Sequence, residues 1–380
     1  MFFNYRLFFR HILKSLFHGQ NKGMQFGPRR IRFFVFFFLF FPALWLSSNL
    51  GFLLDHLFFC GFRKQRVEKP VFILGNFRSG STMLHRLLAQ DTANFTSIKT
   101  WEIYSAPSIS QRKMLRGIRI VDGLFGGKLH KMLIEWNERQ LGQVKIHTVG
   151  IYEPEEDEGL LYYVWYSLFV WFFFPDQFEY SRFDHFDQFL QKPVRQRIMR
   201  FYRRCIQRHL YCRAPEKTYL TKNPSHTGKI DSLLEEFPDA HIIYLYRDPE
   251  DMISSTVSWF SFAMHYFADI PEPYPHKQMM MEMARHYYLY PVQRLQEESR
   301  ERYLMINYKD LTGKLEEVVN EIYRQFGFSM DPSFVSHVKS TARRSRSYAS
   351  KHYHSPGQVG INNEELDRYF GDISDFLTDI

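Results

Sequence analysis

The segment Gly75-Asn-Phe-Arg-Ser-Gly-Ser-Thr82 has the residue types that bind a phosphate-like anion. Glycine lets the backbone approach the anion, and the guanidinium of Arg78 supplies positive charge. Backbone N–H groups at a helix start, together with hydroxyls, donate further hydrogen bonds to such a group. The candidate donors are Ser79, Gly80, Ser81 and Thr82. The segment therefore predicts an anion-binding loop.

The spacing of this segment is close to that of the nucleotide-binding loop G-x-x-x-x-G-K-[ST]. Ser81 stands where that loop has its lysine, so hydrolysis of ATP or GTP is less favoured. A P-loop kinase or nucleoside triphosphatase stays open as an alternative function at this point.

A second anion site is predicted from Arg247, which follows the apolar run His241–Tyr246, and from Ser255, eight residues further on. An arginine at a strand end and hydroxyls at the next helix start can hold a second phosphate group. An ordinary Arg–Asp ion pair beside a helix cap is the alternative reading of this segment.

Together the two motifs resemble the PAPS-dependent sulfotransferases, whose loop for the 5′-phosphosulfate reads [RK]-S-G-[ST]-[ST]. The resemblance implies that Arg247 and Ser255 hold the 3′-phosphate of PAPS (3′-phosphoadenosine 5′-phosphosulfate), the co-substrate, and it implies no metal. Thr221-Lys-Asn-Pro224 resembles a segment of the membrane-associated tyrosylprotein and carbohydrate members, by which Lys222 would reach the sulfuryl oxygens. Asn307–Leu311 resembles the segment whose tyrosine contacts adenine, which indicates Tyr308.

Sulfuryl transfer needs a general base for the attacking hydroxyl and positive charge, here from Arg78 and Lys222, for the leaving phosphate. The tyrosylprotein-type enzymes place a glutamate about twenty residues after the loop, so the resemblance favours Glu102 as the base. The acidic segment Glu153–Glu158 is the next candidate, although a solvated acidic helix start explains it as well. His226 is a third option.

The elements that position these residues form an alternating pattern. Short apolar runs predict buried strands at Pro70–Gly75, Tyr219–Lys222, His241–Tyr246 and Tyr303–Tyr308. Helices are predicted at Ser81–Gln90, Ser232–Phe237 and Leu315–Phe326, and residues 105–215 are expected to be largely helical, with Leu160–Phe174 in the core. This order predicts an α/β fold, a P-loop-like parallel sheet flanked by helices.

The N-terminal region differs from the rest of the chain. Residues 1–32 carry seven basic residues and no acidic one, and residues 2–17 read as a basic amphipathic helix. That helix either lies on a membrane or packs on the protein's own body. Phe33–Leu46 is aromatic and interrupted by Pro42, too short for a span, so an interfacial anchor is favoured. We expect a membrane-associating arm at 1–60 and a single catalytic domain at 61–380.

Charge and cysteine content limit the partners. The net charge of +8 falls almost wholly on the arm, which disfavours nucleic acid as a partner. Three cysteines without metal or disulfide spacing suit a reducing compartment, which predicts membrane association on the cytoplasmic side. A hydroxyl-bearing acceptor is implied, and the aromatic arm favours an amphipathic lipid, a glycolipid or a membrane-proximal glycan. A non-catalytic membrane-bound nucleotide-binding scaffold is the remaining alternative.

Overall fold

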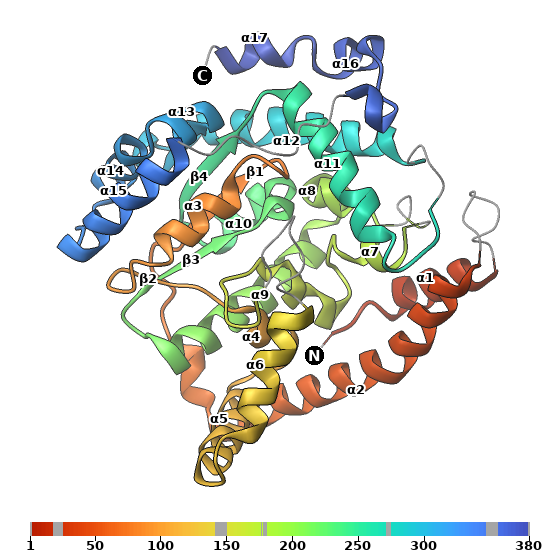
Figure 1. The fold of residues 1–380 in the computed structure, drawn as a ribbon, viewed down its shortest axis with the longest axis vertical. Helices are drawn as coiled ribbons and strands as arrows, with labels where there is room; N and C mark the ends of the chain where they lie inside the picture. The colour runs from red at the N-terminus through yellow and green to blue at the C-terminus, as the bar shows by residue number, and fades with distance from the viewer. Residues whose placement is uncertain are drawn as a thin grey trace.

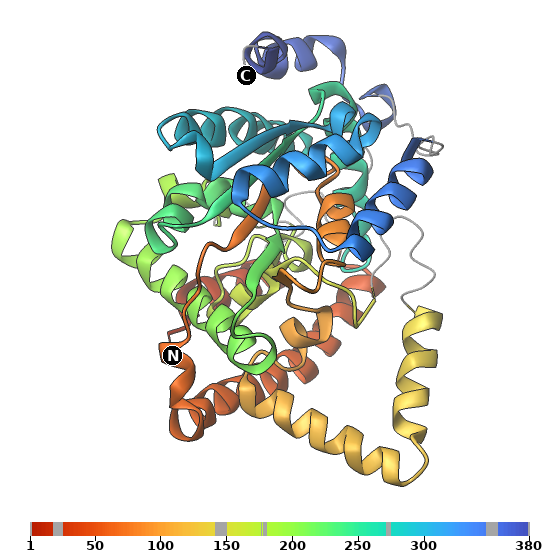
Figure 2. The ribbon, with the colours of Figure 1, turned by 90° about the vertical axis from the view of Figure 1, so that its left-hand side faces the viewer.

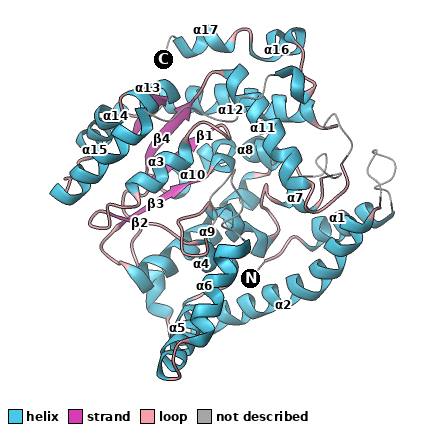
Figure 3. Cartoon of the chain, in the orientation of Figure 1, coloured by secondary structure: helices cyan, strands magenta, loops and turns pink. Residues whose placement is uncertain are grey.

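A five-stranded parallel sheet lies at the centre of the protein (Figure 3). The computed structural model describes residues 2–17, 26–140, 150–175, 177, 181–270, 275–346 and 356–378. The strands in the order β2-β3-β1-β4-β5 are β2 (Phe95–Thr96), β3 (Thr218–Lys222), β1 (Val71–Gly75), β4 (His241–Tyr246) and β5 (Tyr303–Asn307). The predicted α/β fold is confirmed, and the sequence-based strand boundaries differ by at most one residue.

The central strands are buried on both faces, as their continuous apolar runs require. Phe72 and Leu74 of β1 enter one apolar cluster, whereas Val71 and Ile73 enter another. Val71 of β1 is in register with both Leu220 of β3 and His241 of β4. The alternation places a separate hydrophobic core on each side of the sheet.

Helices cover both faces of the sheet (Figure 1). One core contains residues of α3 (Ser81–Leu88), α13 (Tyr308–Gly313), α14 (Leu315–Phe326) and α15 (Pro332–Arg346). The other core contains residues of α9 (Lys192–Arg213), α10 (Ile230–Glu236), α11 (Pro249–Met264) and α12 (Lys277–Gln296). Short 3₁₀ turns lie between them: η2 (Cys60–Lys64), η3 (Asp157–Val164), η5 (Phe183–His185), η6 (Pro224–Lys229), η7 (Arg300–Arg302) and η8 (Pro356–Val359).

Five of the remaining described helices lie between β2 and α9 in the sequence, and two lie near the C-terminus. They are α4 (Thr100–Tyr104), α5 (Ile109–Leu124), α6 (Lys128–Gln140), α7 (Val170–Phe173), α8 (Phe186–Phe189), α16 (Asn363–Phe370) and α17 (Ile373–Thr378). The α5–α6 hairpin projects from the body, as Figure 2 shows in yellow and gold. Leu160, Trp165 and Trp171 are buried, which confirms the prediction that this aromatic stretch belongs to the core.

The N-terminal helices α1 (Tyr5–Phe17) and α2 (Pro28–Phe58) pack on the body. Phe8 of α1 and Phe41 of α2 both contact the buried ring of Trp165, with ring centroids 4.8 and 5.2 Å away. The sequence allows residues 2–17 to lie on a membrane or to pack on the protein's own body. In the structure they pack on the body. The division into an arm and a catalytic domain at residue 60 stays a prediction.

Helix α2 corrects the expectation of a short apolar run broken by Pro42. The helix has 31 residues in total and passes through Pro42 without a break. It is long and apolar enough to cross a membrane. Both of its ends are bound to the same body, however. Arg30 donates a 2.6 Å hydrogen bond to the carbonyl of Phe173, and Asp55 pairs with Arg208 at 2.8 Å. These contacts hold α2 along the body, where it curves around one edge (Figure 1).

Candidate active site

The parallel sheet brings the predicted anion-binding residues to one edge. Lys222 ends β3, the loop 76–80 follows β1, Arg247 follows β4 and Tyr308 follows β5. Because these strands are neighbours and parallel, their carboxyl ends lie side by side. We call this group, with the loop residues Arg78–Thr82 and with Ser255, the donor edge.

The loop after β1 has a conformation that its glycines permit. Gly75 has φ +133°, and a methyl group there would lie 2.1 Å from the carbonyl oxygen of Leu245. Gly80 has φ +90°, and a methyl group there would lie 2.8 Å from the ring of Tyr308. Arg78 has φ +66° in the left-handed region, which is costly for a residue with a side chain and typical of functional loops.

The structure joins the two sequence motifs. Arg78 Nε donates a 3.0 Å hydrogen bond to Ser255 Oγ, and Arg247 Nη1 lies 3.4 Å from the carbonyl oxygen of Arg78. The guanidinium carbon of Arg247 lies 4.5 Å from the ring centroid of Tyr308. Residues 169 and 177 positions apart therefore form one cluster. Arg247 also approaches Asp251, at 3.4 Å, so the ion pair of the alternative reading is present as well.

The donor edge retains polar atoms that a phosphate group would satisfy. The hydroxyl of Ser79 and Nε of Arg247 are buried and have no hydrogen-bond partner among the described residues. Buried donors without a partner are rare and costly, so such atoms point to a ligand. Ser81 is buried and Thr82 half-buried in the first turn of α3, where backbone N–H groups are also available. These residues fit an anionic nucleotide.

Lys222 at the end of β3 forms a buried ion pair with Glu156. His85 of α3 lies nearby: burial lowers its pKa to about 3, and the charge of Lys222 contributes, whereas that of Glu155 acts in the opposite direction. Glu155 is half-buried. The Lys222–Glu156 pair therefore lies at the end of β3, the strand next to β1, which leads into the anion-binding loop.

Glu153 is exposed, but Asp157 and Glu158 at the end of the acidic segment are buried, which overturns the interpretation of a solvated helix start for these two residues. Asp157 accepts a 2.7 Å hydrogen bond from the hydroxyl of Tyr219, and burial raises its pKa. Glu158 pairs with Lys229 at 2.5 Å and accepts a 2.6 Å hydrogen bond from the backbone of Leu168. These two carboxylates therefore have buried structural partners in the core.

Glu102 lies in a different charged group, which we call the Glu102 cluster: Glu102, Arg112, His209 and Arg213. Its carboxylate is 3.0 Å from Arg213, 3.6 Å from Arg112 and 3.6 Å from His209. Burial alone would raise the pKa of Glu102, but these groups outweigh burial and lower the pKa from 4.5 to about 2. A carboxylate with so low a pKa accepts a proton poorly, which disfavours the sequence-based choice of Glu102 as the base.

His226 lies beneath the acidic segment. Its ring is buried, with Nε2 3.9 Å from Asp157 and 3.8 Å from Glu158. Burial, and then the charge of Lys229, lower its pKa well below the ordinary value, so the ring is neutral near pH 7. His226 therefore lies as a neutral ring between buried groups, and neither of its ring nitrogens has a hydrogen-bond partner among the described residues.

A cavity of about 1020 Å³ opens beside the acidic segment, among α4, α5, α6 and the end of α9. Ile151 and Tyr152, which directly precede the acidic segment, line the cavity together with Tyr104. Burial and then the charges of Glu155 and Glu156 raise the pKa of Tyr104. Spacing in the sequence did not indicate the cavity, because its lining comes from five separated segments.

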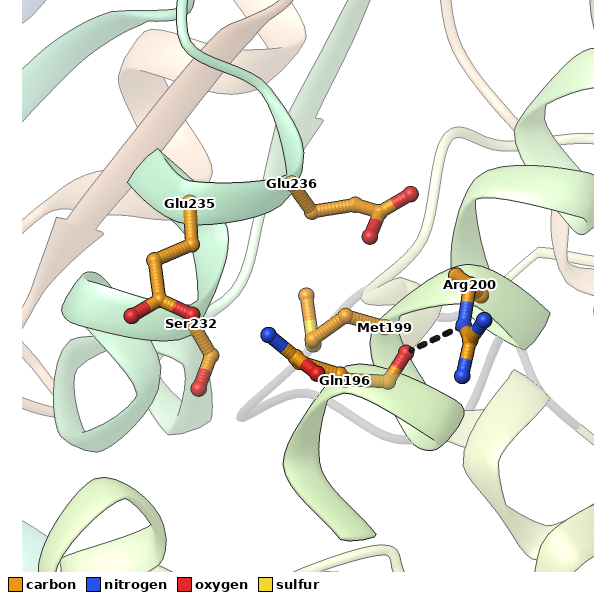
Figure 4. Close-up of a pocket in the computed structure, with 6 residues that line it drawn as sticks. All are labelled: Gln196, Met199, Arg200, Ser232, Glu235 and Glu236. Atoms are coloured by element: carbon orange, nitrogen blue, oxygen red, sulfur yellow. Dashed lines mark hydrogen bonds between the residues drawn. The ribbon is translucent and has the colours of Figure 1, made fainter. Parts of the chain in front are cut away.

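A smaller cavity, of about 280 Å³, lies between α9 and α10 (Figure 4). It is lined by Gln196, Met199, Arg200, Ser232, Glu235 and Glu236. These residues come from the first half of α9 and from α10, whereas the donor edge lies at strand ends. The basic segment 343–354, which also resembles a nucleotide-closing loop of the sulfotransferases, lies largely outside the described residues.

Comparison with known proteins gives a consistent result. The model of the sulfotransferase family matches residues 70–332. The chain is 24% identical over 333 residues to the omega-hydroxy-beta-dihydromenaquinone-9 sulfotransferase Stf3 of Mycobacterium bovis, covering 81% of this chain and 74% of the relative. The same values hold for the Mycobacterium tuberculosis protein.

Two solved structures share the fold. Sulfotransferase STF9 from Mycobacterium avium superposes with a TM-score of 0.69 at 19% identity, covering 87% of this chain and 81% of that one. STF1 from Mycobacterium tuberculosis H37Rv gives a TM-score of 0.65 at 21% identity, covering 88% and 84%.

Proposed function

The chain belongs to the sulfotransferase family, and from that premise we propose that it transfers a sulfuryl group from PAPS to a hydroxyl of a membrane lipid. The observation that carries this proposal is the convergence of Arg78, Ser255, Arg247 and Tyr308 at one edge of the sheet. Two arginines and partnerless donors suit a nucleotide with two separate phosphate groups.

In the proposed complex, each part of the donor edge has its own role. The loop Arg78–Thr82 binds the 5′-phosphosulfate, while Arg247 and Ser255 bind the 3′-phosphate. Tyr308, which already contacts Arg247, lies against the adenine. PAPS supplies an activated sulfate, so the protein's contribution is positioning and electrostatic stabilisation.

We propose Glu156 as the general base in place of Glu102. Glu156 removes the proton of the acceptor hydroxyl as its oxygen bonds to sulfur and the bond from sulfur to the phosphate oxygen breaks. Lys222, which the structure pairs with Glu156, and Arg78 then stabilise the negative charge on the leaving phosphate. Glu155 is the substitute if Glu156 proves dispensable.

The proposed acceptor is an amphipathic lipid. The relative Stf3 is named for a hydroxylated menaquinone, which is a lipid. The cavity among α4, α5, α6 and the end of α9 is lined by apolar side chains such as Trp101, Leu115 and Leu133, and its volume suits a bulky apolar group. Its lining also includes basic side chains, among them Arg112, Arg116 and Arg119, which suit the polar part of an amphipathic molecule.

We further propose that the enzyme lies on the cytoplasmic face of a membrane through α2, without spanning it. A spanning helix puts its two ends on opposite sides of the bilayer. Here both ends of α2 are bound to the same body, by Arg30 and by Asp55. The sparse free cysteines agree with the reducing side.

An assay with labelled PAPS and a panel of hydroxyl-bearing lipids tests the proposed function. Transfer of label to lipid without magnesium dependence supports it. Labelling from ATP instead would indicate a kinase, and binding of adenosine 3′,5′-bisphosphate without any turnover would indicate a non-catalytic scaffold.

A further inference from the structure

The α5–α6 hairpin exposes apolar side chains to solvent, which is unfavourable unless another apolar surface covers them. At its tip Leu124 is 79% exposed and Phe125 78% exposed. Met132 and Leu129, on α6, are 66% and 61% exposed. Isolated exposed leucines are ordinary, but an apolar cluster at the end of a projecting hairpin marks an interaction surface.

The hairpin is firmly built. Asp122 accepts hydrogen bonds of 3.0 Å from the backbone N–H groups of Leu129 and His130, so it fixes the start of α6 against the end of α5. At the base, Asp55 of α2 accepts hydrogen bonds of 3.0 and 2.8 Å from the N–H groups of Ile109 and Ser110. The hairpin and α2 are therefore fixed to each other.

The charge on the hairpin is one-sided. Arg116, Arg119, Lys128 and Lys131 are exposed, whereas Asp122 is buried and bound to backbone groups. Glu135, further along α6, is the one exposed acidic residue among the described side chains of the hairpin, so its exposed charge is predominantly positive. An apolar tip flanked by basic side chains suits a bilayer with anionic lipids, where the tip enters the acyl region and the bases meet the headgroups.

The hairpin surface continues onto α2. The outward side of α2 exposes Phe36, Phe40 and Leu57, at 54, 62 and 64%. Figures 1 and 2 both place α2 and the hairpin at the lower end of the molecule. Two apolar elements at one end define a single docking face.

We propose that the tip of the α5–α6 hairpin inserts into one leaflet of an anionic bilayer while α2 lies along its surface. The cavity at the base of the hairpin, lined by Leu133 and Trp136 of α6 and by Tyr104 of α4, then receives a lipid acceptor directly from that leaflet. This second part rests on the proposed function.

Vesicle flotation tests the insertion of the tip. The double variant Leu124→Asp, Phe125→Asp should bind vesicles of phosphatidylcholine and phosphatidylglycerol roughly tenfold or more weakly than the parent protein. The matched variant Leu124→Met, Phe125→Leu keeps the apolar surface and should bind like the parent. Equal binding by the parent and the double Asp variant would overturn the proposal.

The basic side chains have a separate test. Arg116→Gln with Arg119→Gln should weaken binding to these anionic vesicles and reduce its salt dependence, with no change on pure phosphatidylcholine. A parent that ignores vesicles and forms a dimer broken by Leu124→Asp would assign the surface to a second copy, against the proposal.

The cavity is tested with a dansyl-labelled long-chain alcohol in the same vesicles. Leu115→Trp, at a lining position, should weaken probe binding several-fold, whereas Met114→Trp, at the exposed neighbouring position, should not. Equal probe binding by both variants contradicts the acceptor route. Binding of adenosine 3′,5′-bisphosphate should be unchanged in every variant, and its absence in the parent would instead refute the proposed donor site.

Discussion

The donor edge and the Glu102 cluster are two charged regions that differ in how many of their polar groups have hydrogen-bond or ion-pair partners. In the Glu102 cluster, one carboxylate is surrounded by Arg112, His209 and Arg213 and also accepts a 3.0 Å hydrogen bond from the backbone of Lys99. At the donor edge, Ser79 and Arg247 retain buried donors without a partner in the described structure, and Arg78 has a costly backbone conformation.

The difference separates a structural use of buried charge from a functional one. Removing one member of a buried, fully paired ion cluster destabilises the fold, because the remaining charge is left buried without its partner. A site with unmet donors and local strain is less stable by itself and is completed by a ligand. Substitutions in the Glu102 cluster should therefore affect stability, and those at the donor edge should affect binding and turnover.

The largest effect is expected for the base. Glu156→Gln should lower turnover by roughly 10²–10⁴-fold, because it removes proton transfer, while leaving the affinity for adenosine 3′,5′-bisphosphate nearly unchanged. Single-turnover kinetics with labelled PAPS measures the step. Near-parental turnover would move the role to Glu155, and a loss of turnover in Glu102→Gln with unchanged stability would restore Glu102.

Glu102→Gln should instead destabilise the fold by about 3–5 kcal/mol, because it leaves the buried Arg112 without its carboxylate. Denaturant unfolding, followed by circular dichroism, measures the change. Glu216→Gln, the same change at an exposed glutamate three residues after Arg213, is the control and should cost little. An unchanged midpoint for Glu102→Gln would remove the distinction drawn between the two regions.

Acid should weaken the same cluster. The pKa of Glu102 is lowered from 4.5 to about 2 in the folded protein, so its contribution is fully present above about pH 4.5 and is lost as the pH falls towards 2. The lowering corresponds to roughly 3 kcal/mol. Unfolding free energies across this range should fall less steeply for Glu102→Gln than for the parent, and parallel curves would contradict this.

At the donor edge, Arg78→Ala and Arg247→Ala should each weaken binding of adenosine 3′,5′-bisphosphate by roughly tenfold to a hundredfold. Each removes a charge-assisted phosphate contact worth about 1.5–3 kcal/mol. Calorimetry measures the affinity, with Arg324→Ala, an exposed arginine on α14, as a control outside the edge. Parental affinity in both variants would exclude these two phosphate contacts.

The smallest effect concerns strain. Arg78→Gly and Arg78→Ala both remove the guanidinium, but only glycine adopts φ near +66° without cost. Arg78→Gly should therefore be more stable than Arg78→Ala by about 1 kcal/mol. Equal unfolding free energies would mean that the loop relaxes and stores no strain.

That the donor-edge residues lie close together could be predicted from the sequence, because the signals are local. Glycine spacing, an apolar strand and a following arginine all lie within a few residues of one another, and parallel pairing brings the strand ends together. The sequence indicated Lys222 and Glu156 as two separate candidates. Their ion pair could not be predicted, because 66 residues separate them.

The partners of Glu102 and the length of α2 could not be predicted from the local sequence, because both depend on distant residues. The partners of Glu102 lie up to 111 residues away, and their combined charge decides its pKa. Pro42 reads as a break, because proline lacks the N–H and crowds the preceding turn. Phe37 and Phe41, before Pro42, pack against Trp165, and Trp45, after it, donates a hydrogen bond to the carbonyl of Tyr163. The helix is therefore bound to the body on both sides of the proline and stays uninterrupted.

The contact between Asp55 and Arg208 also has a consequence for the order of events during synthesis. Arg208 follows Asp55 by 153 residues, so at about 5–20 residues per second the ribosome makes it roughly 8 to 30 s later. For that interval α2 exists without α9, the helix that holds its end. A membrane or a chaperone therefore meets the apolar helix before the enzyme's own body does.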